Sequence, residues 1–167
     1  SPASVILAAI ESGALTKDKG AVQLQLLSST VSSLSAQNSS ANTGKDRLKP
    51  VTLLTLQLLS LEIRCMSWKI SGHVCEDGKE MWDPLARYIG AFAQATKSIE
   101  KVEFASIYKT IVRLQSGFAK TQTRSSTNFK DNLSVARIAT ILGQLARDAG
   151  CFKEALQLFT ESLQPLS

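Results

Sequence analysis

The sequence predicts an all-α protein of about seven helices that form antiparallel hairpins. Its 167 residues include only four prolines and nine glycines, and runs of β-branched residues are few. Hydrophobic residues make up 44% of the chain and charged residues 20%, which is typical of a globular protein. Residues 50–71 form a leucine-rich stretch without glycine, which favours a long helix over a strand. We therefore expect one helical domain over residues 1–167.

Residues 1–49 predict two helices followed by a loop. A short helix ends at Gly13, and a second begins with Asp18 as its N-cap and extends to about Leu34. Residues 36–49 are rich in Ser and Asn, which predicts a mobile polar loop. Because the chain begins with Ser and carries no secretory signal, we expect it to be a piece of a longer protein.

The third helix is the one that the others are expected to surround. Pro50 suits its first turn and Gly72 its C-terminal end. The uncharged run ends at Glu62, whereas a membrane span needs about 20 apolar residues. A helix that is apolar on every side is buried by its neighbours. The apolar residues are Val51, Leu53, Leu54, Leu56, Leu58, Leu59, Leu61 and Ile63.

Four further helices follow. Asp83 is the expected cap of the next one, with Pro84 in its first position, and the fifth begins at about Glu100. Residues 121–131 predict a second mobile polar loop.

The last two helices are expected to form a hairpin. Asp131 or Asn132 caps the first of them, and the second spans residues 152–163. Gly143 allows close approach between them and Gly150 makes the tight turn.

This final pair resembles the tetratricopeptide repeat. Ala146 departs from the pattern, which prefers an aromatic residue there, and Pro165 comes two residues early. A single repeat cannot bury its own face, so we expect it to stack on other hairpins as a TPR-like α-solenoid. The residues that match the repeat pattern are Leu142, Gly143, Gly150, Phe152, Ala155 and Phe159. Of these, Phe152, Ala155 and Phe159 are expected to fill the seam between the two helices.

Chemistry-bearing residues are few, and we predict no catalytic residue, no metal site and no cofactor. His73 and Cys75 are neighbours in sequence, but no residue is seen to orient the imidazole as a thiol protease requires. The carboxylates of the following segment lack the spacing of a calcium loop. They are Glu76, Asp77, Glu80 and Asp83. The three cysteines, Cys65, Cys75 and Cys151, show no zinc spacing and suggest a reducing compartment.

The excess of positive charge is confined to residues 97–130. This segment contains seven basic and two acidic residues, which gives a net charge of +5. The formal charges of the rest of the chain sum to zero. Four of the basic residues share one side of a helix if that helix runs far enough. They are Lys109, Arg113, Lys120 and Arg124. An ordinary solvated face is one interpretation, and docking of an acidic, extended protein segment is the other. Nucleic acid is less favoured, because the aromatic residues lie at core spacing.

Three stretches carry a resemblance to a known family, namely LLSLEIRCMSWKISGH (residues 58–73), WDPLARYIGAFAQA (82–95) and LSVARIATILGQLARDAGCFKEALQLF (133–159). They resemble the N-terminal helical region of fungal separases, and the opening residues 2–35 are more loosely similar. The first stretch closes with Trp68, Lys69, Gly72 and His73. Together they cover most of the chain.

The resemblance implies a specific role. Separases are large cysteine endopeptidases of the caspase-like clan that cut the kleisin subunit of cohesin at anaphase. Their catalytic His and Cys lie in a C-terminal domain, and no residue here matches that motif. The N-terminal region is an α-helical solenoid that binds the inhibitor securin and helps to present substrate.

We therefore expect a non-catalytic scaffold segment of a separase-like protease of the cytoplasm and nucleus. Its expected partners are securin and other parts of the parent chain, with no small-molecule substrate and no membrane. The first alternative is a generic tetratricopeptide scaffold, for example in a cohesin-loader-like subunit. A nucleic-acid-binding helical repeat and an independent enzyme are less favoured alternatives.

Overall fold

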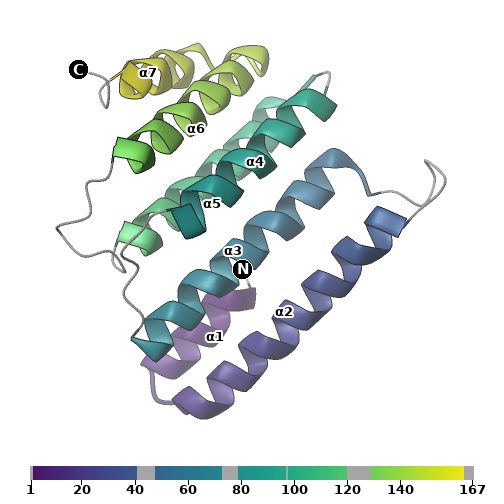
Figure 1. Cartoon of the computed structure of the whole chain (residues 1–167), viewed down its shortest axis with the longest axis vertical. Helices are drawn as coiled ribbons and strands as arrows, with labels where there is room; N and C mark the ends of the chain where they lie inside the picture. Colours follow the sequence, from purple (N-terminus) through teal and green to yellow (C-terminus); the bar gives the residue numbers. More distant parts are fainter. Residues whose placement is uncertain (1, 41–47, 73–78, 97, 120–128, 164–167) are drawn as a thin grey trace. The chain divides into compact units, whose positions relative to one another are not determined.

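The computed structural model describes residues 2–40, 48–72, 79–96, 98–119 and 129–163, and all regular structure in them is helical. The predictions of an all-α fold and of about seven helices are confirmed (Figure 1). The helices are α1 (Pro2–Glu11), α2 (Lys17–Ser40), α3 (Pro50–Ser71), α4 (Lys79–Ala95), α5 (Lys101–Ala119), α6 (Phe129–Asp148) and α7 (Phe152–Leu163).

The chain divides into two compact units, Ser1–Val74 and Cys75–Ser167. The boundary falls in the polar segment that follows Gly72, where few apolar side chains are available to join flanking helices. The sequence predicts one domain over residues 1–167, whereas the contacts define a three-helix and a four-helix unit. Stacking of all the hairpins into one solenoid stays a prediction.

In the first unit α3 packs against both α1 and α2, and α2 and α3 lie side by side (Figure 1). The core between these helices is built on Leu24, Val31 and Ile63. Partly buried apolar residues pack around it, namely Ile6, Leu27, Leu56, Leu59, Met66 and Ile70. Because this core draws on all three helices, it holds the first unit together.

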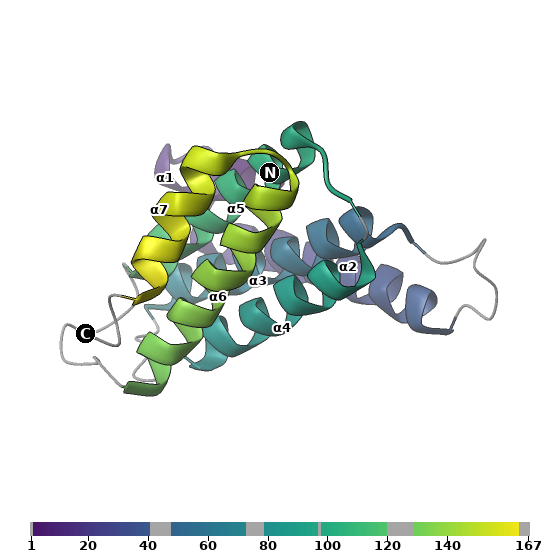
Figure 2. The same cartoon turned by 90° about the horizontal axis from the view of Figure 1, so that it is seen from above.

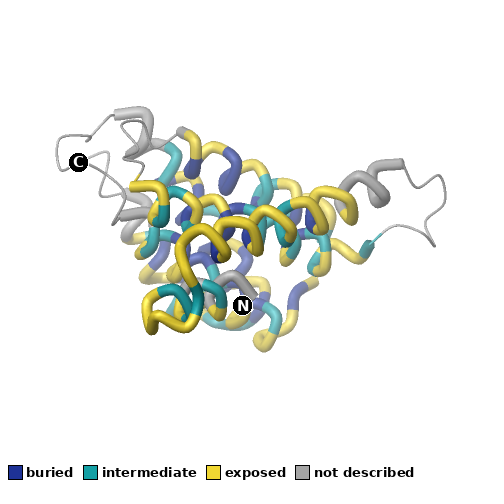
Figure 3. The backbone as a smooth tube through the Cα atoms, turned by 90° about the horizontal axis from the view of Figure 1, so that it is seen from below, coloured by how far each residue is buried: buried dark blue, intermediate teal, exposed yellow. Residues whose placement is uncertain are grey.

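The helical nature of residues 51–63 is confirmed, and the apolar residues expected to be covered are buried or half-buried. The exposed positions on this stretch are the threonines Thr52 and Thr55. Figure 3 shows buried and exposed positions along the described helices. Pro50 begins the helix, and Gly72 ends it with a left-handed φ of 71° while its N–H donates to the Trp68 carbonyl. Glu62 is also buried, which the sequence does not predict.

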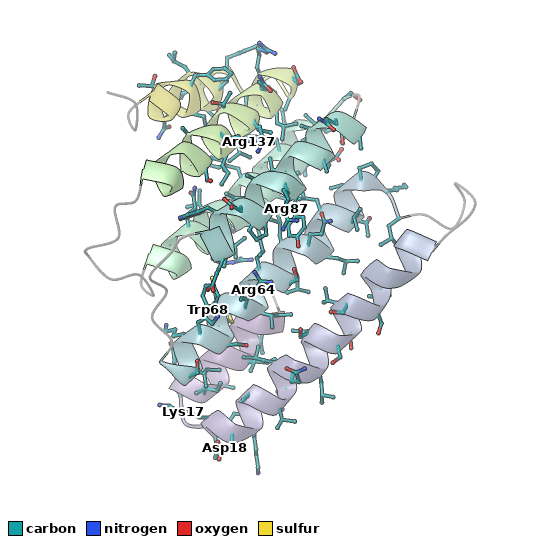
Figure 4. The ribbon with its side chains drawn as sticks, in the orientation of Figure 1. Lys17, Asp18, Arg64, Trp68, Arg87 and Arg137 are labelled. Carbon is teal, nitrogen blue, oxygen red and sulfur yellow. The ribbon has the colours of Figure 1, made fainter. Side chains whose placement is uncertain are left out.

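The start of α2 lies earlier than the sequence predicts. Lys17 and Asp18 both belong to its first turn (Figure 4). The cap is Thr16, whose Oγ1 accepts a hydrogen bond of 3.3 Å from the backbone N–H of Lys19. The prediction of Asp18 as the N-cap is therefore wrong, although its carboxylate still lies where a helix dipole favours negative charge.

Replacing Thr16 with Ala is expected to lower the free energy of unfolding by about 0.5–2 kcal/mol, because the Lys19 N–H then loses its acceptor. Asp18→Ala is the matched control, and we expect it to lose only the dipole interaction, about 0.3–1 kcal/mol. Chemical denaturation followed by circular dichroism measures both. A greater loss for the Asp18 variant would restore Asp18 as the cap.

Both polar segments are shorter than predicted. Residues 36–40 belong to α2, and residues 129–131 belong to α6. Asp131 and Asn132 are therefore inside α6 and do not cap it. Residues 41–47 and 120–128 lie outside the described part of the chain.

The α4 helix starts before Pro84, so that Asp83 is not its cap and Pro84 is not its first residue. Pro84 lacks the N–H that would bond the carbonyl four residues earlier, which disfavours a helix across it. Met81 and Trp82 are nevertheless buried. We infer that burial of these two large side chains stabilises the turn upstream of Pro84, an effect that local sequence does not show.

In the second unit α6 is the central helix and contacts α4, α5 and α7. Figure 2 shows α6 and α7 adjacent as a hairpin. The core contains large apolar side chains from each of the first three helices of the unit, including Leu85, Ile89, Phe104, Ile111, Ile138 and Leu142. On α5, the rings of Phe104 and Tyr108 stack with centroids 5.7 Å apart.

Candidate interaction surfaces

The α6–α7 hairpin contains the repeat-packing residues. Gly143 is buried, and a Cβ added to it would lie 2.7 Å from Cε1 of Phe159. The two helices therefore approach so closely that the Phe159 ring occupies the space of a side chain at Gly143. Gly150 forms the turn with a φ of 80°, where a side chain would be strained. Leu142 and Ala155 are buried in the core.

Phe152 does not fill the seam between these helices, because its side chain is 69% exposed. This residue is the first of α7, and Leu158 is instead buried, at 3% exposure. Leu158 follows Ala155 by three residues and so shares its helical face. That spacing is the sequence feature that indicates burial of Leu158, a residue that the repeat pattern does not include. Ala146, the departure from the repeat, is fully buried.

The structure places two of the four residues of the predicted basic stripe. Lys109 and Arg113 are exposed on α5 and, being four residues apart, lie on one face of the helix. Lys120 and Arg124 lie outside the described residues, and α5 ends at Ala119. We call Lys109 and Arg113 the basic pair. Its role in binding stays a prediction.

A groove between α4 and α6 was not predicted from the sequence. Its volume is about 520 Å³, and it is lined by Asp83, Pro84, Ala86, Arg87, Ser134 and Arg137. The hydroxyl of Ser134 donates a hydrogen bond of 3.0 Å to Oδ1 of Asp83. Arg87 and Arg137 come from neighbouring helices (Figure 4). The two arginines are far apart in the sequence, so only the packing of α4 on α6 reveals their proximity.

Among the described residues, the remaining candidates form no assembled site. His73, Cys75, Glu76 and Asp77 lie outside the described residues, and Glu80 is exposed. Cys65 is buried and Cys151 is half-buried, and neither forms a disulfide with a described residue. In the described ranges no three His, Cys, Asp or Glu side chains gather as metal ligands would. None of the helices there has the length and apolar character to cross a membrane.

Comparison with known proteins identifies the family. No family model matches the sequence, and no solved structure matches it. The separin of Emericella nidulans is 79% identical over all 167 residues. The chain belongs to the separase family. It spans about 8% of the length of that separin. The resemblance predicted from residues 58–73, 82–95 and 133–159 is thereby confirmed.

Proposed function

We propose that the chain is a non-catalytic helical scaffold of a separase, which binds the inhibitor securin and helps to present the kleisin substrate to a protease domain elsewhere in the parent chain. The observation that carries this proposal is the 79% identity to separin over the whole chain. An all-helical architecture built of hairpins suits an interaction scaffold, because helical repeats offer extended surfaces to extended partners.

The exposed basic pair supports an acidic partner. Lys109 and Arg113 project from one face of α5, within the part of the sequence that carries the whole net charge of +5. An extended segment rich in Asp and Glu would gain Coulomb attraction there, mainly as a faster association rate. The pair therefore gives the scaffold a preference for acidic segments without a deep pocket.

Exposed apolar residues support contact with other protein surfaces. Phe152 and Leu156 on α7 are 69% and 71% exposed, and Val22 and Leu26 on α2 are also exposed. Each pair is four residues apart, so each forms an apolar strip on one helix face. Scaffold helices that pack against further helices of a separase chain would cover such strips.

Reversing the charge of the basic pair, Lys109→Glu with Arg113→Glu, is expected to weaken securin binding by full-length separase about tenfold at low salt. The expectation rests on about 1 kcal/mol at most for each exposed ion pair lost. The difference should shrink as salt shortens the Debye length to about 8 Å at 0.15 M. Titration of labelled securin by fluorescence anisotropy measures the effect.

The matched control is Lys17→Glu with Lys19→Glu, which changes the charge equally on exposed residues of the first turn of α2. We expect this control to bind securin like the unmodified protein. Equal affinity and equal salt dependence in the basic-pair variant would leave the pair as an ordinary solvated face and overturn its part in the proposal.

A further inference from the structure

We propose that the groove between α4 and α6 binds an acidic peptide segment, with Arg87 and Arg137 holding a carboxylate side chain of that segment. The inference deepens the proposed function and rests on it for the acidic character of the partner. It assigns binding to a surface that is separate from the basic pair on α5, and to residues that no sequence pattern singles out.

The first argument is that the Arg137 side chain reaches the face of α4 that carries Arg87. A Cβ added to Gly90 would lie 4.0 Å from Nη2 of Arg137, so the Arg137 side chain reaches across from α6 to the surface of α4 at Gly90. Gly90 follows Arg87 by three residues and therefore shares its face of the helix. Arg137 therefore lies in ordinary contact distance of the α4 surface at this position.

The second argument concerns the positive charge of the two arginines. Neither Arg87 nor Arg137 makes an ion pair with a described residue, and both are exposed. The Arg87 guanidinium lies 5.9 Å from the centre of the Tyr88 ring, which is a weak cation–π contact near the limit of about 6 Å. Two positive groups that line one groove repel each other, and a carboxylate placed between them offsets that repulsion. Arginine suits this task because its planar fork binds both carboxylate oxygens.

The third argument selects a peptide over a free anion. Asp83 also lines the groove and, as a carboxylate, it would repel a bare anion. It is held by the hydroxyl of Ser134, which uses one acceptor site of Oδ1. The remaining acceptor sites of Asp83 can receive a backbone N–H. A peptide offers both the carboxylate for the arginines and the N–H for Asp83. Pro84 and Ala86, which are both buried, add apolar lining to the groove.

The probe is a fluorescein-labelled octapeptide of alternating glutamate and glycine, titrated into full-length separase by fluorescence anisotropy. Arg87→Glu with Arg137→Glu is expected to weaken its binding at least tenfold. The charge-matched control, Arg147→Glu with Lys153→Glu, alters exposed residues outside the groove and should bind normally. Arg87→Lys with Arg137→Lys keeps the charge but loses the fork, so we expect an intermediate affinity. Circular dichroism of each variant verifies that the helices are intact.

Two further peptides separate the sources of negative charge and test the chemistry. The glutamine counterpart should not bind, and a phosphoserine counterpart should bind more weakly than glutamate because Asp83 opposes the second charge. Glutamine binding equal to glutamate, or groove-variant affinity equal to that of the control, would overturn the proposal. Tighter phosphoserine binding would overturn the choice of a carboxylate.

Securin titrations of the same variants distinguish this inference from the proposed function. If the basic-pair variant loses securin and the groove variant retains both securin and the glutamate peptide, the scaffold role stands and the groove assignment falls. If the peptide requires Arg87 and Arg137 while securin binding is unchanged in every variant, the groove stands and the securin proposal falls.

Discussion

Replacing Leu158 with Ala is expected to lower the free energy of unfolding by about 2–5 kcal/mol. Leu158 lies on α7 and is only 3% exposed, so truncation removes buried apolar surface and leaves a cavity in the α6–α7 hairpin. Neighbouring side chains recover part of that loss only if they can move into the space. Chemical denaturation of the chain, followed by circular dichroism, measures the change.

Leu156→Ala is the matched control for this prediction. It makes the same chemical change on the same helix, two residues away, at a side chain that is 71% exposed. Such surface substitutions usually alter stability by no more than about 0.5 kcal/mol. Comparable losses in the two variants would mean that α7 presents a different face to α6, and would contradict the packing of the hairpin.

Features that depend on local chemistry were predictable from the sequence. Proline at the start of α3 and glycine at its end act through their own backbone preferences, and both ends of that helix lie where these residues predict. The number of helices followed from apolar periodicity in the same way. Family membership was also within reach, because the resembling stretches are long and cover most of the chain.

Features that depend on packing were not predictable. The α4 helix extends upstream of Pro84, where Met81 and Trp82 are buried. The local sequence does not reveal that burial. The repeat pattern placed Phe152 in the seam by analogy, whereas the helix directs Leu158 inward. A pattern can identify a hairpin without fixing which apolar residue of its second helix faces the first.

The candidate binding residues also divide into those that local spacing predicts and those that only packing brings together. Lys109 and Arg113 belong to one helix, so their spacing alone predicted a shared face. Extending the stripe to Lys120 and Arg124 required a longer α5 than the one that ends at Ala119. The groove on α4 and α6 joins Arg87 to Arg137, which no helical periodicity connects.

Replacing Gly143 with Ala is expected to lower the free energy of unfolding by a net amount of up to about 2 kcal/mol, because an overpacked core usually costs about 1–3 kcal/mol. The new Cβ would lie 2.7 and 2.9 Å from two carbons of the Phe159 ring, closer than non-bonded carbons tolerate. Either the ring rotates or α6 and α7 separate. This cost opposes the better helix propensity of Ala, about 1 kcal/mol. Denaturant titration gives the net change.

Gly117→Ala is the matched control, because Gly117 also lies within a helix and nothing is within 4 Å of the Cβ that would be added. There only the propensity acts, and we expect a gain of about 0.5–1 kcal/mol. Phe159→Leu should relieve most of the cost in the Gly143→Ala background, and the double-mutant cycle measures that coupling. If Gly143→Ala is as stabilising as Gly117→Ala, the ring does not occupy this space. The opposite signs expected for one substitution at two helical glycines follow from a single difference, the presence of Phe159.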